Sequence, residues 1–376
     1  MSGLAEQLAK LPLEVTARLQ QYGFDQARLV RLGAALARGE VDRGLVTGRI
    51  EPPAAGDVVE LPDPKSPAYR ELEQRGEAAL RAGEVALIVL AGGMATRMGG
   101  VVKALVEALP GKTFLDLRLA EMASLEKRYG VAPPLWLMTS AATDAGIRSA
   151  LGPRRDGERI ATFAQHLSLR LTPNGDLFLD ASSQPSEHAP GHGDLPEALK
   201  QSGLLDRFVA RGGKMLLIAN LDNLGGTVDP ALVGFHLAHG SDVTSEVVDK
   251  LADDRGGIPV RVERKLRVLE EFRIPPSFDP STVRVFNTNT FHVSARALCD
   301  LSMDWRFFAV QKKVDGVPVV QFERIVNEIT DELSTVYLRL PRTGERARFL
   351  PVKDPEELER RRSEIELVVR ARGILA

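Results

Sequence analysis

Cysteine is nearly absent from this sequence, which has one among 376 residues. A lone thiol, Cys299, can form neither an intrachain disulfide nor a thiolate metal cluster. The N-terminus also lacks a basic segment followed by an apolar run, so we expect no secretion signal. Both absences favour a protein of the reducing cytoplasm.

Long apolar runs and a strong net charge are missing as well. The longest apolar run, Val85–Ala91, is far too short to cross a bilayer, so no membrane partner is expected. The formal net charge is -2, which provides no bulk attraction to nucleic acid or to an anionic membrane. An anionic ligand must therefore be held by a local site rather than by the charge of the whole chain.

What the sequence does contain is typical of a large globular fold. Hydrophobic residues make up 44% and charged residues 27% of the chain, unlike a disordered protein. Apolar runs of strand length alternate with helical patterns, which predicts an α/β fold with a mixed, mostly parallel sheet and helices on both faces. The predicted strands are Val85–Leu90, Leu135–Thr139, Met215–Asn220, Val243–Val248, Val285–Val293 and Val317–Gln321, and the early helices are Asp116–Tyr129 and Leu195–Arg211.

The first part of the chain is expected to be mainly helical. Residues 1–80 contain two amphipathic helical patterns in the first forty residues and a third over Ala68–Arg81. Between them, the proline- and glycine-bearing stretch Glu51–Pro67 is predicted to be a surface connection. The α/β nucleotidyltransferase domain is then expected over residues 81–345.

Two later segments depart from the α/β pattern. Short strands over Ile258–Phe272 predict an antiparallel insertion. Residues 346–376 are expected to form a short C-terminal segment that carries Lys353 and a helix. In that helix, glutamates alternate with arginines over Asp354–Arg372, which is typical of a solvated face rather than of a basic binding patch.

A glycine-rich turn, AGGMATRMGG over residues 91–100, follows the first strong strand. Gly92 and Gly93 would let backbone N–H groups approach an anion without obstruction by a Cβ. Thr96 would add a hydroxyl donor, and Arg97 would add the positive charge that phosphates need. Alone, the pattern is more often a tight strand–helix turn without a ligand.

Spacing excludes two familiar phosphate-binding motifs. The dinucleotide fingerprint G-x-G-x-x-G would need a glycine at Ala95. A P-loop ending in Gly111-Lys112-Thr113 would need a glycine at Val106. The ligand of the turn must therefore be inferred from other segments.

Together with this turn, four later segments resemble, in order, the motifs of the UDP-sugar pyrophosphorylase family, and most closely its UDP-glucose-forming members. They are PGHGD at 190–194, NLDNLG at 220–225, FNTNT at 286–290 and RFLPVK at 348–353. The resemblance implies an enzyme that joins UTP to a sugar 1-phosphate and releases pyrophosphate. A sugar-phosphate oxygen attacks the α-phosphorus directly, so such an enzyme needs positioning and charge neutralisation rather than a protein nucleophile.

The resemblance also implies roles for individual residues around the phosphates. Asp222, which follows an apolar strand, would be the Mg²⁺ carboxylate, as suits a hard cation that is held mainly by phosphate oxygens. Lys103 and Lys353 would face the phosphates beside Arg97 and stabilise transition-state charge. Without the resemblance, each lysine would be interpreted as a solvated surface residue.

Further residues match the nucleotide- and sugar-binding positions of the family. Gln165 would pair with uracil, since an amide both donates and accepts. Gly191 would bring its backbone close to the base, and His192 would line the phosphate or sugar pocket. Polar residues expected near the sugar hydroxyls, where they would discriminate epimers, are Asn220, Glu246, Asn287, Asn289 and Glu323. Buried asparagines can instead satisfy backbone groups, so this alternative stays open.

Departures from the family pattern keep other functions open. Ala95 and Val102 replace a glycine and a proline, which motivates the alternative of a non-catalytic nucleotide-sugar binding protein. The Thr96-Arg97 pair resembles the Thr-Arg pair of UDP-N-acetylhexosamine pyrophosphorylases. Synthesis of UDP-N-acetylglucosamine, or of a broad range of UDP-sugars, is therefore a second alternative. No C-terminal β-helix domain is expected after Lys353, which disfavours assembly by that route and favours a monomer.

Overall fold

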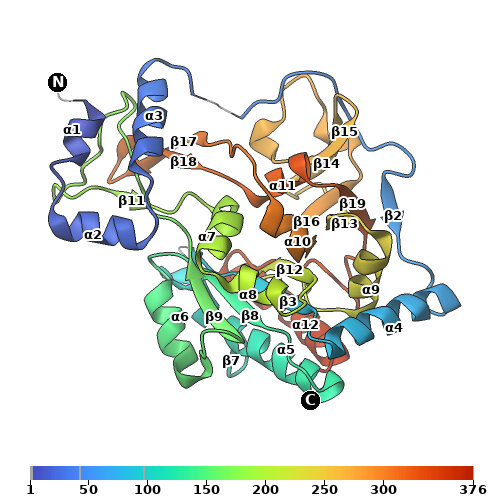
Figure 1. Ribbon diagram of the computed structural model, residues 1–376. Coiled ribbons are helices and arrows are strands. Elements are labelled where there is room, and N and C mark those ends of the chain that lie inside the picture. The colour runs from blue at the N-terminus through green and yellow to red at the C-terminus, as the bar shows by residue number, and fades with distance from the viewer. Residues whose placement is uncertain (1–2, 42–43, 96–97, 376) are drawn as a thin grey trace.

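The computed structural model describes residues 3–41, 44–95 and 98–375 (Figure 1). Its centre is an eight-stranded sheet in the order β2-β19-β13-β16-β12-β3-β8-β9. Strand β16 runs antiparallel to both neighbours, and the other neighbouring pairs are parallel. The strands are β2 (Val58–Glu60), β3 (Val85–Leu90), β8 (Leu135–Thr139), β9 (Ile160–Ala164), β12 (Met215–Asn220), β13 (Val243–Asp249), β16 (Val285–Ser294) and β19 (Thr335–Arg339). The predicted α/β fold with a mixed, mostly parallel sheet is confirmed.

Helices bury both faces of this sheet, which explains why β3 is continuously apolar. Successive side chains of a strand point to opposite faces, so Leu87 and Ile88 enter different cores. Leu87 packs in a core with α4 (Pro67–Arg81), α5 (Phe114–Tyr129), α6 (Asp144–Leu151), α9 (Pro230–His239) and α12 (Pro355–Ala371). Ile88 packs in a core with α7 (Leu195–Gln201), α8 (Leu204–Ala210) and α10 (Ala295–Asp300). The helix predicted over 195–211 is thus two helices, separated at Gly203, whose φ is 70°.

The N-terminal helices form a separate core with a hairpin outside the central sheet. The helices are α1 (Leu4–Leu8), α2 (Leu13–Gln21) and α3 (Gln26–Ala37), one more than predicted, because Pro12 separates the first two. Leu8, Leu19 and Leu29 pack there with Val320 and Phe322. The last two belong to β18 (Val317–Glu323), which pairs with β17 (Phe308–Val314) and not with the central sheet.

The stretch 51–67 has no buried residue, as expected for a surface connection, but it also contains strand residues that the prediction left out. β1 (Ile50–Glu51) pairs with β14 (Ile258–Val262), and β2 joins the edge of the central sheet by pairing with β19. Both strands are only two or three residues long, so their pairing depends on distant partners and leaves no local pattern. The predicted antiparallel insertion is confirmed, since β14 pairs with β15 (Lys265–Leu269). Among the described residues, no helix combines the length and apolarity that membrane crossing requires.

Candidate active site

The candidate site lies at the carboxyl ends of two adjacent parallel strands, β3 and β12. Leu90 and Asn220 are partners in register at these ends. After Leu90 the chain enters the glycine-rich turn, and after Asn220 it enters the loop that carries Asp222. Ligands of α/β sheets bind at this edge, because loops from different strands converge there.

Lys103 and Asp222 meet directly at this edge. The Lys103 Nζ atom lies 2.6 Å from the Asp222 Oδ2 atom, and the two side chains are 20% and 15% exposed. Strand pairing of β4 (Met94–Ala95) with β5 (Val101–Val102) folds the turn back, so that the Lys103 amide donates to the Gly93 carbonyl at 3.3 Å. This pairing brings a lysine from beyond the turn onto a carboxylate of another strand.

The C-terminal lysine motif reaches the same place. The backbone amide of Val352 donates to Asp222 Oδ2 at 3.4 Å, and the next residue is the exposed Lys353. The Asn223 amide fixes this segment by donating to the Arg348 carbonyl at 3.0 Å, and its oxygen accepts from the Leu350 N–H at 2.8 Å. The structure therefore gathers the segments of Lys103, Asp222 and Lys353, three of the residues predicted to face phosphate or metal, from three distant parts of the chain.

The glycine turn also lies against the predicted uracil residue. A Cβ added at Gly92 would come within 3.0 Å of both terminal atoms of the Gln165 amide, whereas one added at Gly93 would meet no atom within 4 Å. The Gly92 carbonyl accepts from Ser140 Oγ at 2.9 Å, which fixes the peptide beneath the amide. Gly92 and Gln165 are thus packed together, as a shared nucleotide subsite requires.

Of the remaining residues of the turn, the structure describes Ala95 but not Thr96 and Arg97. Ala95 is a buried residue of β4, paired with Val101, and is not among the residues with positive φ. Alanine therefore fits this position without backbone strain. Thr96 and Arg97, predicted for nucleotide binding and catalysis, lie outside the described residues.

The PGHGD loop is pressed against the backbone that follows β18. Gly191 has φ 104°, and a Cβ there would lie 2.8 Å from the Arg324 carbonyl oxygen. A Cβ at Gly193 would lie 2.6 Å from backbone atoms of Arg324 and Ile325. Only glycine fits either position, so these glycines serve the close approach of two backbones and do not by themselves identify a ligand.

His192, in the same loop, is held as a neutral imidazole with a defined tautomer. Its Nδ1 atom accepts from the Val326 N–H at 3.0 Å, so the proton of the neutral ring belongs on Nε2. Burial lowers the pKa of His192 to about 4, and the ring is neutral at physiological pH. Nε2–H is therefore available as an uncharged hydrogen-bond donor.

Two of the predicted sugar residues contact each other. Asn289 Nδ2 donates to Asn220 Oδ1 at 2.9 Å, which joins β16 to the end of β12. Asn289 has φ 57°, a left-handed conformation that asparagine tolerates better than most residues. Its buried Oδ1 has no hydrogen-bond partner within the described structure. This atom is an acceptor that a ligand hydroxyl would satisfy.

Two further predicted residues differ in their surroundings. Asn287 is buried, and its side-chain oxygen accepts from Ser245 Oγ at 3.3 Å. Its backbone N–H donates to the Gly257 carbonyl. Glu323 accepts from Gln321 at 2.5 Å and lies 3.8 Å from Lys312 on the β17–β18 hairpin. No contact among the described residues joins Glu323 to the asparagine pair, so the structure does not bring it to their subsite.

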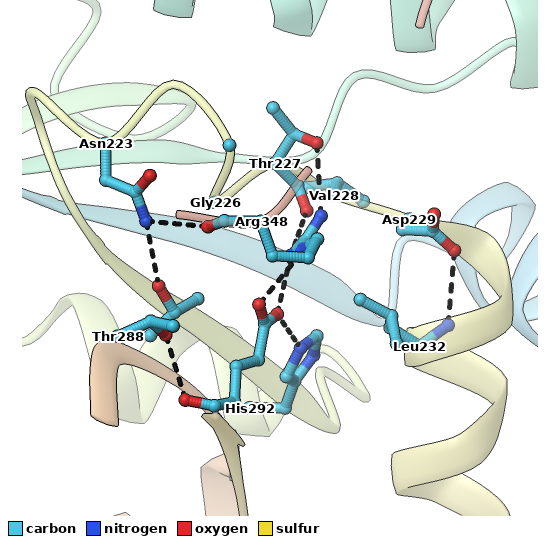
Figure 2. A network of polar contacts seen from close by, with 12 residues as sticks. Asn223, Gly226, Thr227, Val228, Asp229, Leu232, Thr288, His292 and Arg348 are labelled. Atoms are coloured by element: carbon cyan, nitrogen blue, oxygen red, sulfur yellow. Dashed lines mark hydrogen bonds and ion pairs between the residues drawn. The ribbon is translucent and has the colours of Figure 1, made fainter. Parts of the chain in front are cut away.

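Glu246 is buried and bonds with Arg348 and His292, two labelled members of the polar network in Figure 2. Its side chain is fully buried, and its two oxygens accept from Arg348 at 2.5 and 2.8 Å and from His292 at 2.8 Å. Burial opposes ionisation, but Arg348 and His292 outweigh it and hold the Glu246 pKa at about 2. A carboxylate with no exposed surface and two engaged oxygens is not placed to meet a sugar hydroxyl, contrary to the predicted contact.

Glu270 is an acidic residue near Gly257 that no sequence motif indicated. Glu270 follows β15, and a Cβ at Gly257 would come within 3.0 Å of its Oε1 atom. Asn327 donates to the same oxygen, and burial raises the Glu270 pKa. Gly257 is also the residue whose carbonyl accepts from the backbone N–H of Asn287, so Glu270 lies near Asn287. In the sequence, Glu270 is only one of two adjacent glutamates at the end of the predicted insertion.

A second residue that the sequence did not reveal is Arg118 of α5. It is fully buried and donates to the carbonyls of Asn220, Asn223 and Gly226, at 3.1, 2.7 and 2.9 Å. Glu121 pairs with it at 3.0 Å and accepts from a further amide of the loop at 2.8 Å. Arg118 therefore holds the loop on both sides of Asp222, and no local pattern distinguishes it from a surface arginine of an amphipathic helix.

Comparison with known proteins places this geometry in a family. The sequence profile of the UTP–glucose-1-phosphate uridylyltransferase family matches residues 43–368. The protein of that name from Hordeum vulgare is 32% identical over 292 residues, which are 73% of this chain and 61% of the relative. The chain thus spans less than two thirds of that relative's length.

Solved structures share the fold. UDP-glucose phosphorylase from Trypanosoma brucei superposes with a TM-score of 0.77 at 22% identity, covering 96% of this chain and 79% of the other. A single-residue mutant of UDP-glucose pyrophosphorylase from Leishmania major, in complex with UDP-glucose, gives a TM-score of 0.72 at 22% identity, covering 95% and 78%. Since the profile match extends over most of its length, the chain belongs to the UTP–glucose-1-phosphate uridylyltransferase family.

Proposed function

We propose that this chain transfers the uridylyl group of UTP to glucose 1-phosphate, forming UDP-glucose and pyrophosphate. The observation that carries the proposal is the meeting of Lys103, Asp222 and the Val352–Lys353 segment at the sheet edge. Phosphoryl chemistry of this kind needs cations placed around the phosphates and no protein nucleophile. Membership of the family supports the same reaction.

Asp222 is the residue that would hold Mg²⁺. Among the described residues, no group of three or more histidine, cysteine or acidic side chains gathers as a preformed metal cage. A single partly exposed carboxylate suits Mg²⁺, which keeps water and phosphate oxygens among its ligands. Bound there, the cation would neutralise phosphate charge. Lys103 and Lys353 would add positive charge, and Arg118 would hold the Asp222 loop in place.

We assign the nucleoside to the surface formed by Gly92 and Gln165. The Gln165 amide lies over the flat, side-chain-free face of Gly92, where it can present both a donor and an acceptor to a base edge. His192 would donate from Nε2–H to an oxygen of the ligand, since its Nδ1 is already engaged. Neither residue has to change protonation state for these contacts.

We assign the sugar to the neighbourhood of Asn220 and Asn289. The unpaired Asn289 Oδ1 is one acceptor for a hydroxyl, and Glu270 beside Gly257 offers a second. Groups of this kind discriminate sugars because a wrong epimer leaves a buried polar atom unpaired. Glu246 is not part of this subsite, because Arg348 and His292 occupy its carboxylate.

The non-catalytic alternative loses one of its motives. It was motivated by Ala95 and Val102 in place of a glycine and a proline, and Ala95 is an unstrained member of β4. A reducing cytoplasmic compartment remains our proposal from the single cysteine.

Pyrophosphate release from UTP and Mg²⁺ with a panel of sugar 1-phosphates tests the function. We expect turnover with glucose 1-phosphate and slower turnover with galactose and N-acetylglucosamine 1-phosphates. UTP binding without turnover on any sugar would refute the enzyme proposal. Turnover confined to the N-acetylated sugar would refute the glucose assignment and favour the UDP-N-acetylglucosamine alternative.

A further inference from the structure

A cavity borders the later part of the loop that carries Asp222, where Thr227, Val228 and Asp229 line it. Its volume is about 700 Å³, a size typical of sites for small molecules. Its walls are formed by α4, α5, the start of α9, the segment after β19 and the end of α12. None of the residues assigned above to UTP, metal or sugar lines it. The cavity is therefore separate from the proposed catalytic site.

Most charges in its walls neutralise one another. Arg339 bridges Glu60 and Asp249 at 3.1 and 2.6 Å, and Arg342 pairs with Asp254 at 2.7 Å. Two wall residues have the partners described above: Arg348 pairs with Glu246, and Glu121 pairs with Arg118. Asp229 accepts from two amides at the start of α9, and the last two wall carboxylates, Glu73 and Glu345, are exposed to solvent.

Arg372 is the exception among the less exposed charges of the walls. This residue caps the C-terminal end of α12 and donates to the carbonyls of Gly225 and Ala347, at 2.6 and 2.7 Å, and to Thr227 Oγ1. All three acceptors are neutral, and no carboxylate of the described chain lies within ion-pair distance. Burial, with repulsion from Arg348, lowers the Arg372 pKa to about 9. This partly buried cation has no ion-pair partner among the described residues and is compensated only at longer range by Asp229, Glu121 and Glu246, so an anionic ligand would compensate it directly.

Two more guanidinium groups border the cavity and have no carboxylate partner in the described part of the chain. Arg346 donates to the Tyr69 hydroxyl, and its Cζ lies 5.1 Å from the centre of that ring. Arg128 donates to the Arg372 carbonyl at 2.8 Å. Planar guanidinium groups bind carboxylates and phosphates through paired hydrogen bonds. Three of them around one cavity form a site suited to a molecule with several negative charges.

The cavity is physically connected to the catalytic loop. Arg372 binds Gly225 and Thr227 in the loop that carries Asp222. Arg348 also donates to the Thr227 carbonyl, at 3.0 Å (Figure 2). The third acceptor of Arg372, the Ala347 carbonyl, lies in the segment that leads to Lys353. A ligand that draws hydrogen bonds from Arg372 would therefore compete with the contacts that hold both catalytic segments.

We propose that this cavity binds a small polyanion, a phosphorylated or polycarboxylated metabolite, and that its occupancy changes UTP binding through the Asp222 loop. The class follows from Arg372, Arg346 and Arg128, and the coupling follows from the bonds of Arg372 to both catalytic segments. The binding part of the proposal is independent of the proposed reaction.

Calorimetric titration of the full chain with inorganic tripolyphosphate and with citrate tests the binding. UDP-glucose is added at saturation to occupy the catalytic site, and the titration is repeated without it. We expect at least one probe to bind, and its affinity to fall about tenfold or more in Arg372→Gln and Arg346→Ala. Arg360→Ala, an exposed residue of α12 outside the cavity, is the matched control and is expected to bind normally.

The two probes distinguish the source of the anion, since binding of tripolyphosphate alone indicates a phosphorylated ligand and binding of citrate alone a carboxylated one. Absence of binding by both probes, or equal binding in wild type and the two cavity variants, overturns the proposal. Arg346 is exposed, so Arg346→Ala keeps the test available if Arg372→Gln does not fold.

Coupling between the cavity and the catalytic site is measured as the KM for UTP with and without the probe. A shift in wild type that Arg346→Ala abolishes supports it, and an unchanged KM in wild type overturns it.

Discussion

Lys103 and Asp222 form an ion pair across the candidate active site, with the Lys103 Nζ atom 2.6 Å from Asp222 Oδ2. The residues are 119 positions apart and follow different strands of the sheet. In the proposed reaction the lysine faces phosphate and the carboxylate holds Mg²⁺. The pair therefore occupies, in the free protein, contacts that Mg²⁺ and UTP would each replace. Ligand binding would exchange one set of charge contacts for another and leave neither group uncompensated.

Asp222→Asn tests the metal role with little change in shape. We expect turnover to fall by at least about a hundredfold, because the neutral amide no longer anchors the cation. Circular dichroism and thermal unfolding check that the fold is retained, and pyrophosphate release measures activity. A folded variant with wild-type turnover would refute the role of Asp222.

Lys103→Met separates two consequences of the ion pair. Turnover should fall by about a hundredfold, since a cation beside the phosphates is lost. Binding of Mn²⁺ to the protein without UTP, measured by electron paramagnetic resonance, should become tighter, because the Asp222 carboxylate no longer has a competing ammonium. Lys112→Met, an exposed lysine, is the control. Weaker Mn²⁺ binding in Lys103→Met than in wild type would contradict the competition.

The sequence predicted the fold best where the local pattern was strong. The apolar runs of β3, β8 and β12 are buried on both faces, so composition alone marked their positions. β2 and β19 at the sheet edge escaped prediction, because short strands acquire their identity from a partner hundreds of residues away. The β17–β18 pairing was missed for a related reason: a strand pattern does not state which sheet the strand joins.

Prediction of the site followed the same division. Lys103, Asp222 and Lys353 were recognised through ordered motifs, and the structure brings their segments together. Glu246 was matched to the family in the same way, yet its carboxylate is buried against Arg348, a partner 102 residues later. Arg118 and Glu270 carry no motif, since their importance comes from carbonyls and glycines that only the tertiary structure places beside them.

Arg118 is expected to support both stability and activity. Arg118→Met leaves Glu121 buried without its cation and should lower the free energy of unfolding by about 3–5 kcal/mol. Adding Glu121→Leu should restore much of that stability, because the unpaired charge is removed. Activity should stay low in the double variant, since the Asn220, Asn223 and Gly226 carbonyls still lack their donor. Denaturant unfolding and turnover separate the effects, and full activity in a stable double variant would contradict the positioning role.

The Glu246 network predicts loss of stability in acid. Folding lowers the Glu246 pKa from 4.5 to about 2, so its contribution is present above about pH 4.5 and disappears as pH falls towards 2. The contribution is on the order of 3 kcal/mol at neutral pH. Glu246→Gln should be less stable at neutral pH and should lose less further stability than wild type between about pH 5 and about pH 3. Parallel pH profiles of wild type and variant in denaturant unfolding would refute this origin.

Gly92 and Gln165 are expected to act as one unit in nucleotide binding. A methyl group at Gly92 would lie 3.0 Å from the Gln165 amide and must displace it, so Gly92→Ala should raise the KM for UTP by about tenfold. Gln165→Ala should raise it to a similar degree, because the base loses its donor and acceptor. The double variant should be little worse than either single one, since the methyl group then has no amide to displace. Steady-state kinetics with varied UTP measure all four proteins of this cycle. Additive effects of the two substitutions would show that Gly92 acts on the phosphates directly and not through Gln165.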